Sequence, residues 1–176
     1  MGSMISGSGR FELRPITAED KVHIHRGLSH PEVIKHYAVS FLTLEATQEQ
    51  MDWYAQLERE GTGQWWAIRS VGSGEFVGAI GINNIVQHHR RCELGFWLLP
   101  EHWRKGIIRE ALPVVMDHAF NTRGLHRIMA EVETDNPASA KALLHAGFAR
   151  EGTLRECEWK DGRAISLDVF AALNTA

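Results

Sequence analysis

Residues 96–111 read Phe96-Trp97-Leu98-Leu99-Pro100-Glu101-His102-Trp103-Arg104-Lys105-Gly106-Ile107-Ile108-Arg109-Glu110-Ala111. An apolar strand ends at the proline, a short basic segment with one glycine follows, and a helical pattern begins immediately afterwards. This order directs the unpaired N–H groups of a helix N-terminus, and the positive end of the helix dipole, at one point. Such a point suits a phosphate or pyrophosphate, so the stretch predicts an enzyme that holds a phosphorylated cofactor.

Composition narrows the class of protein. The chain has 176 residues, of which 44% are hydrophobic and 23% charged, and these values are typical of one soluble globular domain. The net charge of −3 argues against non-specific binding to nucleic acid. No apolar run approaches the roughly 20 residues of a membrane helix, so no membrane association is expected. Cys92 and Cys157 show neither metal-ligand spacing nor a disulfide framework, and a reducing cytoplasm is the expected location.

The N-terminus carries no targeting signal that we can identify. Residues 1–9 lack a basic region followed by an apolar block, so they do not form a signal peptide. They are interpreted as a cloning remnant before a start at Met4, and we expect them to be disordered. The folded domain is expected to occupy residues 10–174.

Hydrophobic periodicity and turn residues predict alternating strands and helices along that domain. The predicted strands are 11–16, 65–71, 76–86, 92–99, 127–134, 150–159 and 164–172. The predicted helices are a region capped by Thr17 or Asp20 and ending near residue 28, then 31–37, then one opened by Thr43 or Thr47 and ending at Gly61, then 107–121 and 137–146. Pro113 predicts a distortion within 107–121, and Gly78 and Gly81 weaken their strand or mark a bulge. The order indicates one α/β domain with a mixed sheet.

Four places in the chain carry a resemblance to a known family. They are Glu93–Leu98, Trp103–Ile108, Asn136–Ser139 with Gly147-Phe148, and Glu151–Arg155 leading to Asp168. Together they resemble the GCN5-related N-acetyltransferases (GNAT), and within them the branch that includes the ribosomal-protein N-terminal acetyltransferases. The resemblance covers about Arg10 to Leu173. It implies a mixed, mostly antiparallel sheet of six to seven strands flanked by helices, with a splayed strand pair holding the cofactor.

The resemblance implies acetyl-CoA as cosubstrate, and the spacing of the cysteines and histidines predicts no metal. The splayed pair would be the strands 93–99 and 127–134, with exposed β-strand backbone pairing to the pantetheine. The implied contacts are Phe96, Trp97, Leu98, Trp103, Arg104, Lys105, Gly106, Ile107, Ile108, Arg109, Asn136 and Ser139. The family loop has Gly or Ala two positions after its main glycine. This chain has Ile108 there, and we expect its side chain to turn toward the core. The spacing of the ten histidines makes no helical metal pair.

Acid–base chemistry is assigned to a short set of residues. The resemblance implies Ser139 as the acid that protonates the departing thiolate, because Tyr37 and Tyr54 lie far from it in sequence. As the base that takes the amine proton, Glu158 ranks first by resemblance, Glu93 second, and Glu133 third. The structural alternative for Ser139 is a local hydrogen bond, and for each carboxylate a solvated or salt-bridged surface position.

The predicted function is direct transfer of an acetyl group from acetyl-CoA to a primary amine, on a protein N-terminus or a small molecule. The alternative is a CoA-binding sensor or scaffold without catalysis. A plain nucleotide binder is disfavoured, because neither a P-loop ending nor a dinucleotide glycine triplet is present. The resemblance places the acceptor site at about 23–56 and 155–164, with Trp53 and Trp159 as candidate lining, and a homodimer is common among similar proteins. The sequence identifies neither the acceptor nor the oligomeric state.

Overall fold

The computed structural model describes residues 4–5 and 9–175, and these form one seven-stranded sheet with the strand order β1-β2-β3-β4-β5-β7-β6. Only β4 and β5 are parallel neighbours, and the other neighbouring strands are antiparallel. This confirms the predicted mixed, mostly antiparallel sheet. The strands are β1 Phe11–Pro15, β2 Gln64–Ser70, β3 Phe76–Val86, β4 Arg91–Leu98, β5 Arg127–Glu133, β6 Ala149–Lys160 and β7 Arg163–Leu173.

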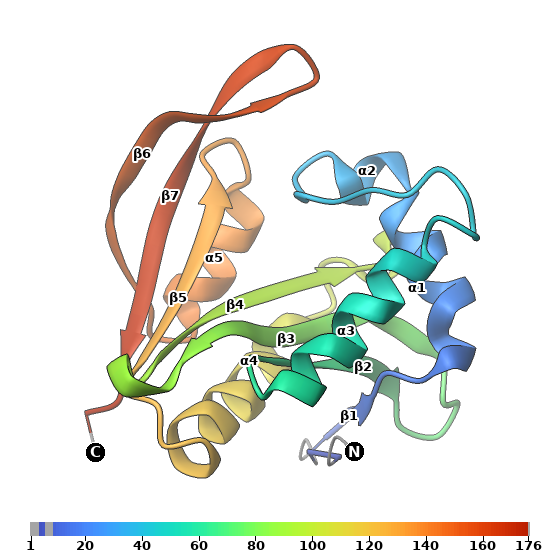
Figure 1. Ribbon diagram of the computed structural model, residues 1–176, viewed down its shortest axis with the longest axis horizontal. Coiled ribbons are helices and arrows are strands. Elements are labelled where there is room, and N and C mark those ends of the chain that lie inside the picture. The colour runs from blue at the N-terminus through green and yellow to red at the C-terminus, as the bar shows by residue number, and fades with distance from the viewer. Residues whose placement is uncertain (1–3, 6–8, 176) are drawn as a thin grey trace.

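Helices cover both faces of the sheet, as Figure 1 shows. The α-helices are α1 Lys21–Leu28, α2 Pro31–Ile34, α3 Gln48–Glu60, α4 Ile107–Asp117 and α5 Pro137–His145. Short 3₁₀ turns occupy Ala18–Asp20, Gln87–His89 and Pro100–His102, and a π-helical turn at His118–Thr122 follows α4. None of the helices in the described part of the chain has both the length and the apolar composition needed to cross a bilayer.

The sheet separates two hydrophobic cores. The larger core joins apolar residues of the sheet to α4 and α5, with Leu112, Val115 and Leu143 fully buried. The smaller core lies on the opposite face and joins α1, α2 and α3 to Trp65 and Trp97. The two cores hold the sheet from both sides.

Glycines on the sheet make room for tryptophan rings. A Cβ at Gly81 would lie 2.3 Å from Cγ of Trp65, and a Cβ at Gly27 of α1 would lie 2.0 Å from Cζ3 of Trp97. Since real Cβ contacts are far longer, the absence of a side chain is required at both positions. Gly81 therefore allows close packing within a regular stretch of β3. The pairing of β2 with β3 shifts register beside Gly78, as expected if that glycine marks a bulge.

Two helix predictions differ from the structure. The second helix ends at Ile34 instead of residue 37. The carbonyl oxygens of Lys35 and Tyr37, beyond its end, accept hydrogen bonds from Lys160 of β6. Helix α4 continues through Pro113, and the change of helix type comes later, at His118–Thr122. Pro113 lies on the exposed side of the helix, where a missing hydrogen bond costs least because water is available.

The structure tests the predictions for the cysteines and, in part, those for the N-terminus. Cys92 is buried and Cys157 exposed, and both are free thiols. Of the expected disordered segment 1–9, only residues 4, 5 and 9 are among the described residues, and Ile5 forms an antiparallel bridge to Leu13. The remainder of that expectation lies outside the described residues.

Candidate active site

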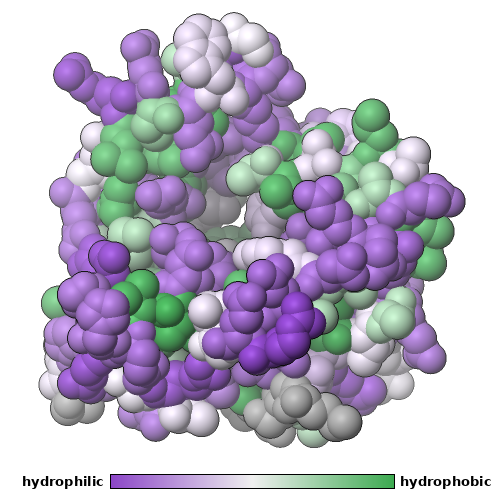
Figure 2. All heavy atoms as spheres, viewed as in Figure 1, coloured by the Kyte–Doolittle hydropathy of each residue, from purple (hydrophilic) through white to green (hydrophobic). Residues whose placement is uncertain are grey.

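The central strands β4 and β5 separate halfway along their length. Strands β4 and β5 pair only at Arg91–Arg127, Cys92–Ile128 and Glu93–Met129, although β4 continues to residue 98 and β5 to residue 133. Figure 1 shows the two strands diverging beyond this point, and the space-filling view of the same face is hollowed between β5 and the α1–α2 region (Figure 2). The predicted splayed strand pair is therefore present, and it opens a cleft into the sheet.

The backbone of β4 presents polar groups to this cleft. Leu99 N–H donates to the Val77 carbonyl at 2.9 Å, and alternation along an antiparallel strand then turns the backbone of Trp97 toward β3 and that of Phe96 and Leu98 toward β5. The Leu98 carbonyl accepts from Nε1 of Trp103 at 3.0 Å. Trp97 itself pairs with Ala79 and is only 4% exposed, so it supports the cleft from beneath.

The N-terminus of α4 has the backbone shape that anion binding requires. Gly106 is the N-cap residue with φ 75°, Arg104 has φ 61°, and both lie in the left-handed region. The first helical bond of this turn runs from Glu110 N–H to the Gly106 carbonyl at 3.2 Å. The N–H groups of Ile107–Arg109 lie ahead of that bond and so point out of the helix end. Left-handed residues beside such amides form a concave anion nest.

Hydrophobic anchoring and cations complete this loop. Ile107 is 1% exposed and Ile108 is partly buried against the same core, which confirms that Ile108 turns inward. Arg104, Lys105 and Arg109 are exposed, so their charges face solvent around the helix end. One further cation, far away in the sequence, lies against this loop.

That cation is Arg10, which precedes β1. Its guanidinium donates to the Lys105 carbonyl at 2.8 Å and, through Nε, to Glu110 Oε1 at 2.9 Å. Arg10 thus fixes the loop before α4 and adds positive charge beside it. Its distance of 95 residues from the loop in the sequence explains why no local pattern predicted the contact.

A second helix N-terminus lies at the end of β5. Asn136 caps α5, accepting from Ser139 N–H at 3.3 Å, and its Nδ2 donates to Ser139 Oγ at 3.0 Å. The expected capping role of Asn136 is confirmed. Because the Ser139 hydroxyl oxygen accepts this bond, the hydroxyl hydrogen can be donated in another direction. Gly147, at φ 94°, follows the helix as predicted.

Three carboxylates share one electrostatic environment at the cleft. Glu131 lies on β5 two residues beyond Met129, the last residue paired with β4. Burial raises the pKa of Glu131, and the negative charges of Glu93 and Glu158 raise this pKa further. Glu93 also accepts from Asn84 Nδ2 at 3.0 Å. The structure therefore brings the two first-ranked base candidates into the electrostatic environment of Glu131, which the sequence analysis overlooked.

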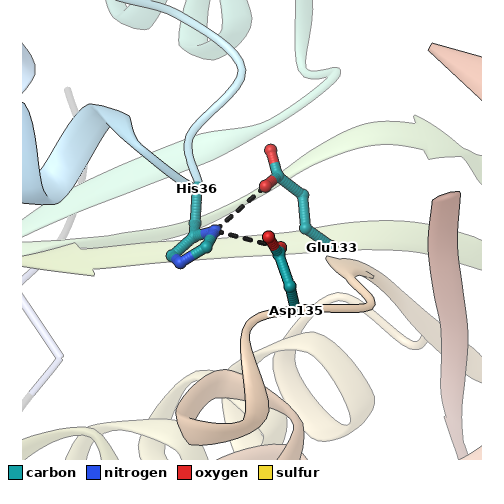
Figure 3. A group of neighbouring side chains, drawn as sticks. All are labelled: His36, Glu133 and Asp135. Atoms are coloured by element: carbon teal, nitrogen blue, oxygen red, sulfur yellow. Dashed lines mark hydrogen bonds and ion pairs between the residues drawn. The ribbon is translucent and has the colours of Figure 1, made fainter. Parts of the chain in front are cut away.

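Glu133, the third-ranked carboxylate, is held in ion pairs. It is 7% exposed, and its two oxygens contact His36 Nδ1 at 2.9 Å and Lys160 Nζ at 2.8 Å. Asp135 lies 3.4 Å from the same His36 nitrogen, as drawn in Figure 3. His36, Glu133 and Asp135 could in principle hold a metal ion, but the Lys160 ammonium already neutralises Glu133. Because both oxygens of Glu133 already have partners, this residue suits a binding role better than proton transfer.

The tyrosines are poor acids in this fold. Burial raises the pKa of Tyr54 to about 12 and raises the pKa of Tyr37 well above its ordinary value. Both side chains belong to the smaller core. Of the two tryptophans considered for the acceptor pocket, Trp53 packs against Trp65 with ring centroids 5.9 Å apart, and Trp159 is 77% exposed. Trp53 thus packs against the smaller core and borders a pocket between α3 and β3, whereas Trp159 is exposed on β6.

Known proteins similar to this chain were identified at the levels of family, sequence and structure. The sequence profile described as "Acetyltransferase (GNAT) domain" matches residues 10–149. An uncharacterized N-acetyltransferase of Bacillus subtilis, YoaA, is 36% identical over 163 residues, which is 92% of each chain. The ribosomal-protein-serine acetyltransferase of Escherichia coli is 24% identical over 92% of this chain and 85% of its own.

A solved structure agrees in fold. The crystal structure of spermidine N-acetyltransferase from Vibrio cholerae, in complex with CoA and spermine, aligns with a TM-score of 0.85 at 21% identity, covering 94% of this chain and 96% of that one. At this identity the likeness concerns the fold, and the chemistry has to be argued from the residues described above.

Proposed function

Because the chain belongs to the GNAT acetyltransferases, in the branch that includes the ribosomal-protein acetyltransferases, we propose that it transfers the acetyl group of acetyl-CoA to a primary amine. One observation carries the proposal: a helix N-terminus with a left-handed glycine N-cap, Gly106, beside a splayed pair of central strands. Relatives named for acetylation of ribosomal protein and of spermidine support a primary amine as the acceptor, either on a protein N-terminus or on a small molecule.

The cofactor residues follow from the geometry of the cleft. In this proposal the amides of residues 104–109 and the charges of Arg104, Lys105 and Arg109 bind the diphosphate. The outward-facing backbone of Phe96 and Leu98 pairs with the pantetheine arm as an added strand would, and Asn136 borders the same arm from the end of β5. The bound cosubstrate supplies an activated thioester, whose acetyl carbon is open to attack by an amine.

Proton transfer is assigned to the carboxylates and to Ser139. We infer that Glu131 accepts a proton from the acceptor ammonium, directly or through water. Its side chain is exposed on β5 just beyond the last residue paired with β4, and its raised pKa favours proton uptake. Glu93 and Glu158 tune that pKa by their negative charges. The neutral amine nitrogen then bonds to the acetyl carbon and the C–S bond breaks. The nitrogen loses its remaining extra proton to water, which leaves the neutral amide. Ser139 donates its proton to the departing sulfur and regains one from solvent.

A thiol-release assay tests this proposal. Purified protein is mixed with acetyl-CoA and a panel of primary amines, peptides with free N-termini and polyamines, and release of CoA is followed. We expect turnover with at least one acceptor, and a loss of about 10²-fold or more in kcat/KM for Glu131→Gln. Glu19→Gln, at an exposed position in the 3₁₀ turn Ala18–Asp20, serves as the matched control and retains activity. Full activity in Glu131→Gln would refute the assignment of the base.

The same assay separates the alternative function. The buried tyrosines with raised pKa leave the fold without a tyrosine acid, which is the observation that favours a non-catalytic CoA-binding sensor. Such a sensor would bind acetyl-CoA tightly and release no thiol with any member of the panel. Turnover with one acceptor excludes it.

A further inference from the structure

The ammonium group of Lys160 sits in a complete receptor of three oxygen acceptors. Its Nζ contacts Glu133 Oε1 at 2.8 Å, the Lys35 carbonyl at 2.6 Å and the Tyr37 carbonyl at 3.1 Å. A primary ammonium has three N–H donors, so each donor has one acceptor. One of the three is a carboxylate and two are backbone carbonyls, which is the chemistry that recognises a primary ammonium ion.

The receptor is rigidly built. Glu133 is 7% exposed, and His36 Nδ1 holds its second oxygen at 2.9 Å (Figure 3). Asp135 approaches the same nitrogen at 3.4 Å and pairs with Arg163 at 3.3 Å. Burying a carboxylate without a positive partner is strongly unfavourable, so this position requires a cation at Oε1 of Glu133.

The receptor lies where the acceptor side of the cleft is expected. Glu133 stands two residues beyond Glu131 on β5, so both side chains leave the same face of the sheet. The turn of the β6–β7 hairpin extends beyond the other strands of the sheet in Figure 1. Lys160, the last residue of β6, reaches across to the loop that follows α2. The two segments joined by this contact border the hollow seen in Figure 2.

We propose that this receptor is the binding site for an ammonium group of the acceptor, and that Lys160 occupies it until an acceptor displaces it. The inference rests on the proposed acetyl transfer and assigns part of its acceptor site. Amino groups with a pKa near 8 to 10 arrive protonated at neutral pH, with the same three donors as Lys160. A neutral acceptor lacks the positive charge that Glu133 requires, so the site selects cationic amines.

The test removes the Lys160 ammonium group from the receptor. Lys160→Met keeps the apolar stem and removes the charge, and Lys160→Gln serves as a second variant if the first folds poorly. Full-length ¹⁵N-labelled protein is titrated with methylammonium while the amide signals of residues 35–37 and 133 are followed. We expect at least fivefold tighter binding in Lys160→Met than in the unchanged protein. Lys141→Met, at an exposed position on α5, should match the unchanged protein.

Two ligand controls sharpen the outcome. Tetramethylammonium has the charge but no N–H donor, and it should leave these signals in place. Adding Glu133→Gln to Lys160→Met should weaken methylammonium binding at least tenfold. Equal affinity in Lys160→Met and the unchanged protein would overturn the proposal. So would shifts caused by Zn²⁺ and not by methylammonium, because His36, Glu133 and Asp135 would then be metal ligands.

Failure of the site and failure of the proposed function can be told apart. The thiol-release assay is run on the unchanged protein in parallel. Methylammonium binding to Lys160→Met without thiol release from any acceptor supports the receptor and contradicts acetyl transfer. Thiol release from a cationic amine without methylammonium binding at residues 35–37 supports acetyl transfer and contradicts the receptor.

Discussion

Because α1 packs closely against β4, we expect a substitution at Gly27 to lower the free energy of unfolding. In Gly27→Ala the new Cβ would lie 2.0, 2.5 and 2.8 Å from three ring atoms of Trp97. Ordinary contacts between carbon atoms are about 3.5–4.0 Å, so the ring or the helix must move by more than 1 Å. Trp97 is 4% exposed and its ring centroid lies 5.9 Å from that of Phe76, so the ring cannot move freely.

The magnitude follows from two opposing effects. Overpacking of a well-filled core costs about 1–3 kcal/mol, or more where the backbone has to shift. Alanine in place of glycine within a helix returns up to about 1 kcal/mol. We therefore expect Gly27→Ala to lower the free energy of unfolding by about 1–2 kcal/mol. For a domain of this size that corresponds to a decrease in Tm of about 2–8 °C.

Thermal unfolding followed by circular dichroism measures this effect. Gly152→Ala on β6 is the matched control, because a Cβ there meets no atom within 4 Å and the glycine has no positive φ among those recorded. The control should keep the Tm of the unchanged protein within about 2 °C. A Gly27→Ala variant that melts at or above the unchanged protein would refute the close contact between α1 and the Trp97 ring.

Three further predictions concern titration and reactivity. Glu93→Gln removes a negative charge that raises the pKa of Glu131, so this pKa falls. The acid limb of the pH profile of kcat/KM should therefore move to lower pH. An unmoved limb would show that Glu93 does not influence the titration of Glu131. Burial raises the pKa of Cys92 to about 12, so a thiol reagent should label exposed Cys157 in the native protein and Cys92 only after unfolding, as mass spectrometry can check. Ser139→Ala should lower kcat about 10-fold, equivalent to about 1.4 kcal/mol, with CoA affinity kept within about threefold; unchanged kcat would remove Ser139 from the proposed chemistry.

Local patterns predicted the framework of the site. The order strand, proline, basic loop and amphipathic helix in residues 96–111 is a short-range signal, and the structure has β4, the loop and α4 in that order. The capping role of Asn136 is also local, since the residues that it contacts are three positions away. The seven strands were predicted within one or two residues, because their alternation and bounding turns depend on neighbours in the chain.

Long-range electrostatic contacts could not be predicted in the same way. His36 and Glu133 are 97 residues apart, and Lys160 and Tyr37 are 123 residues apart. Helix α2 ends at Ile34, so helical periodicity in residues 31–37 overestimated its length. Glu131 had a usable local signal that we overlooked, because alternation along β5 places it on the same face as Glu133.

Binding of CoA by ¹⁵N-labelled protein tests the central claim most directly. We expect the largest amide shift changes within residues 104–109, because their N–H groups are proposed to bind the diphosphate. Gly106→Trp should weaken CoA binding at least tenfold, since a side chain at φ 75° costs about 1–2 kcal/mol and the indole adds bulk beside the amides. Shifts confined to another part of the molecule, or equal affinity in Gly106→Trp, would contradict the account.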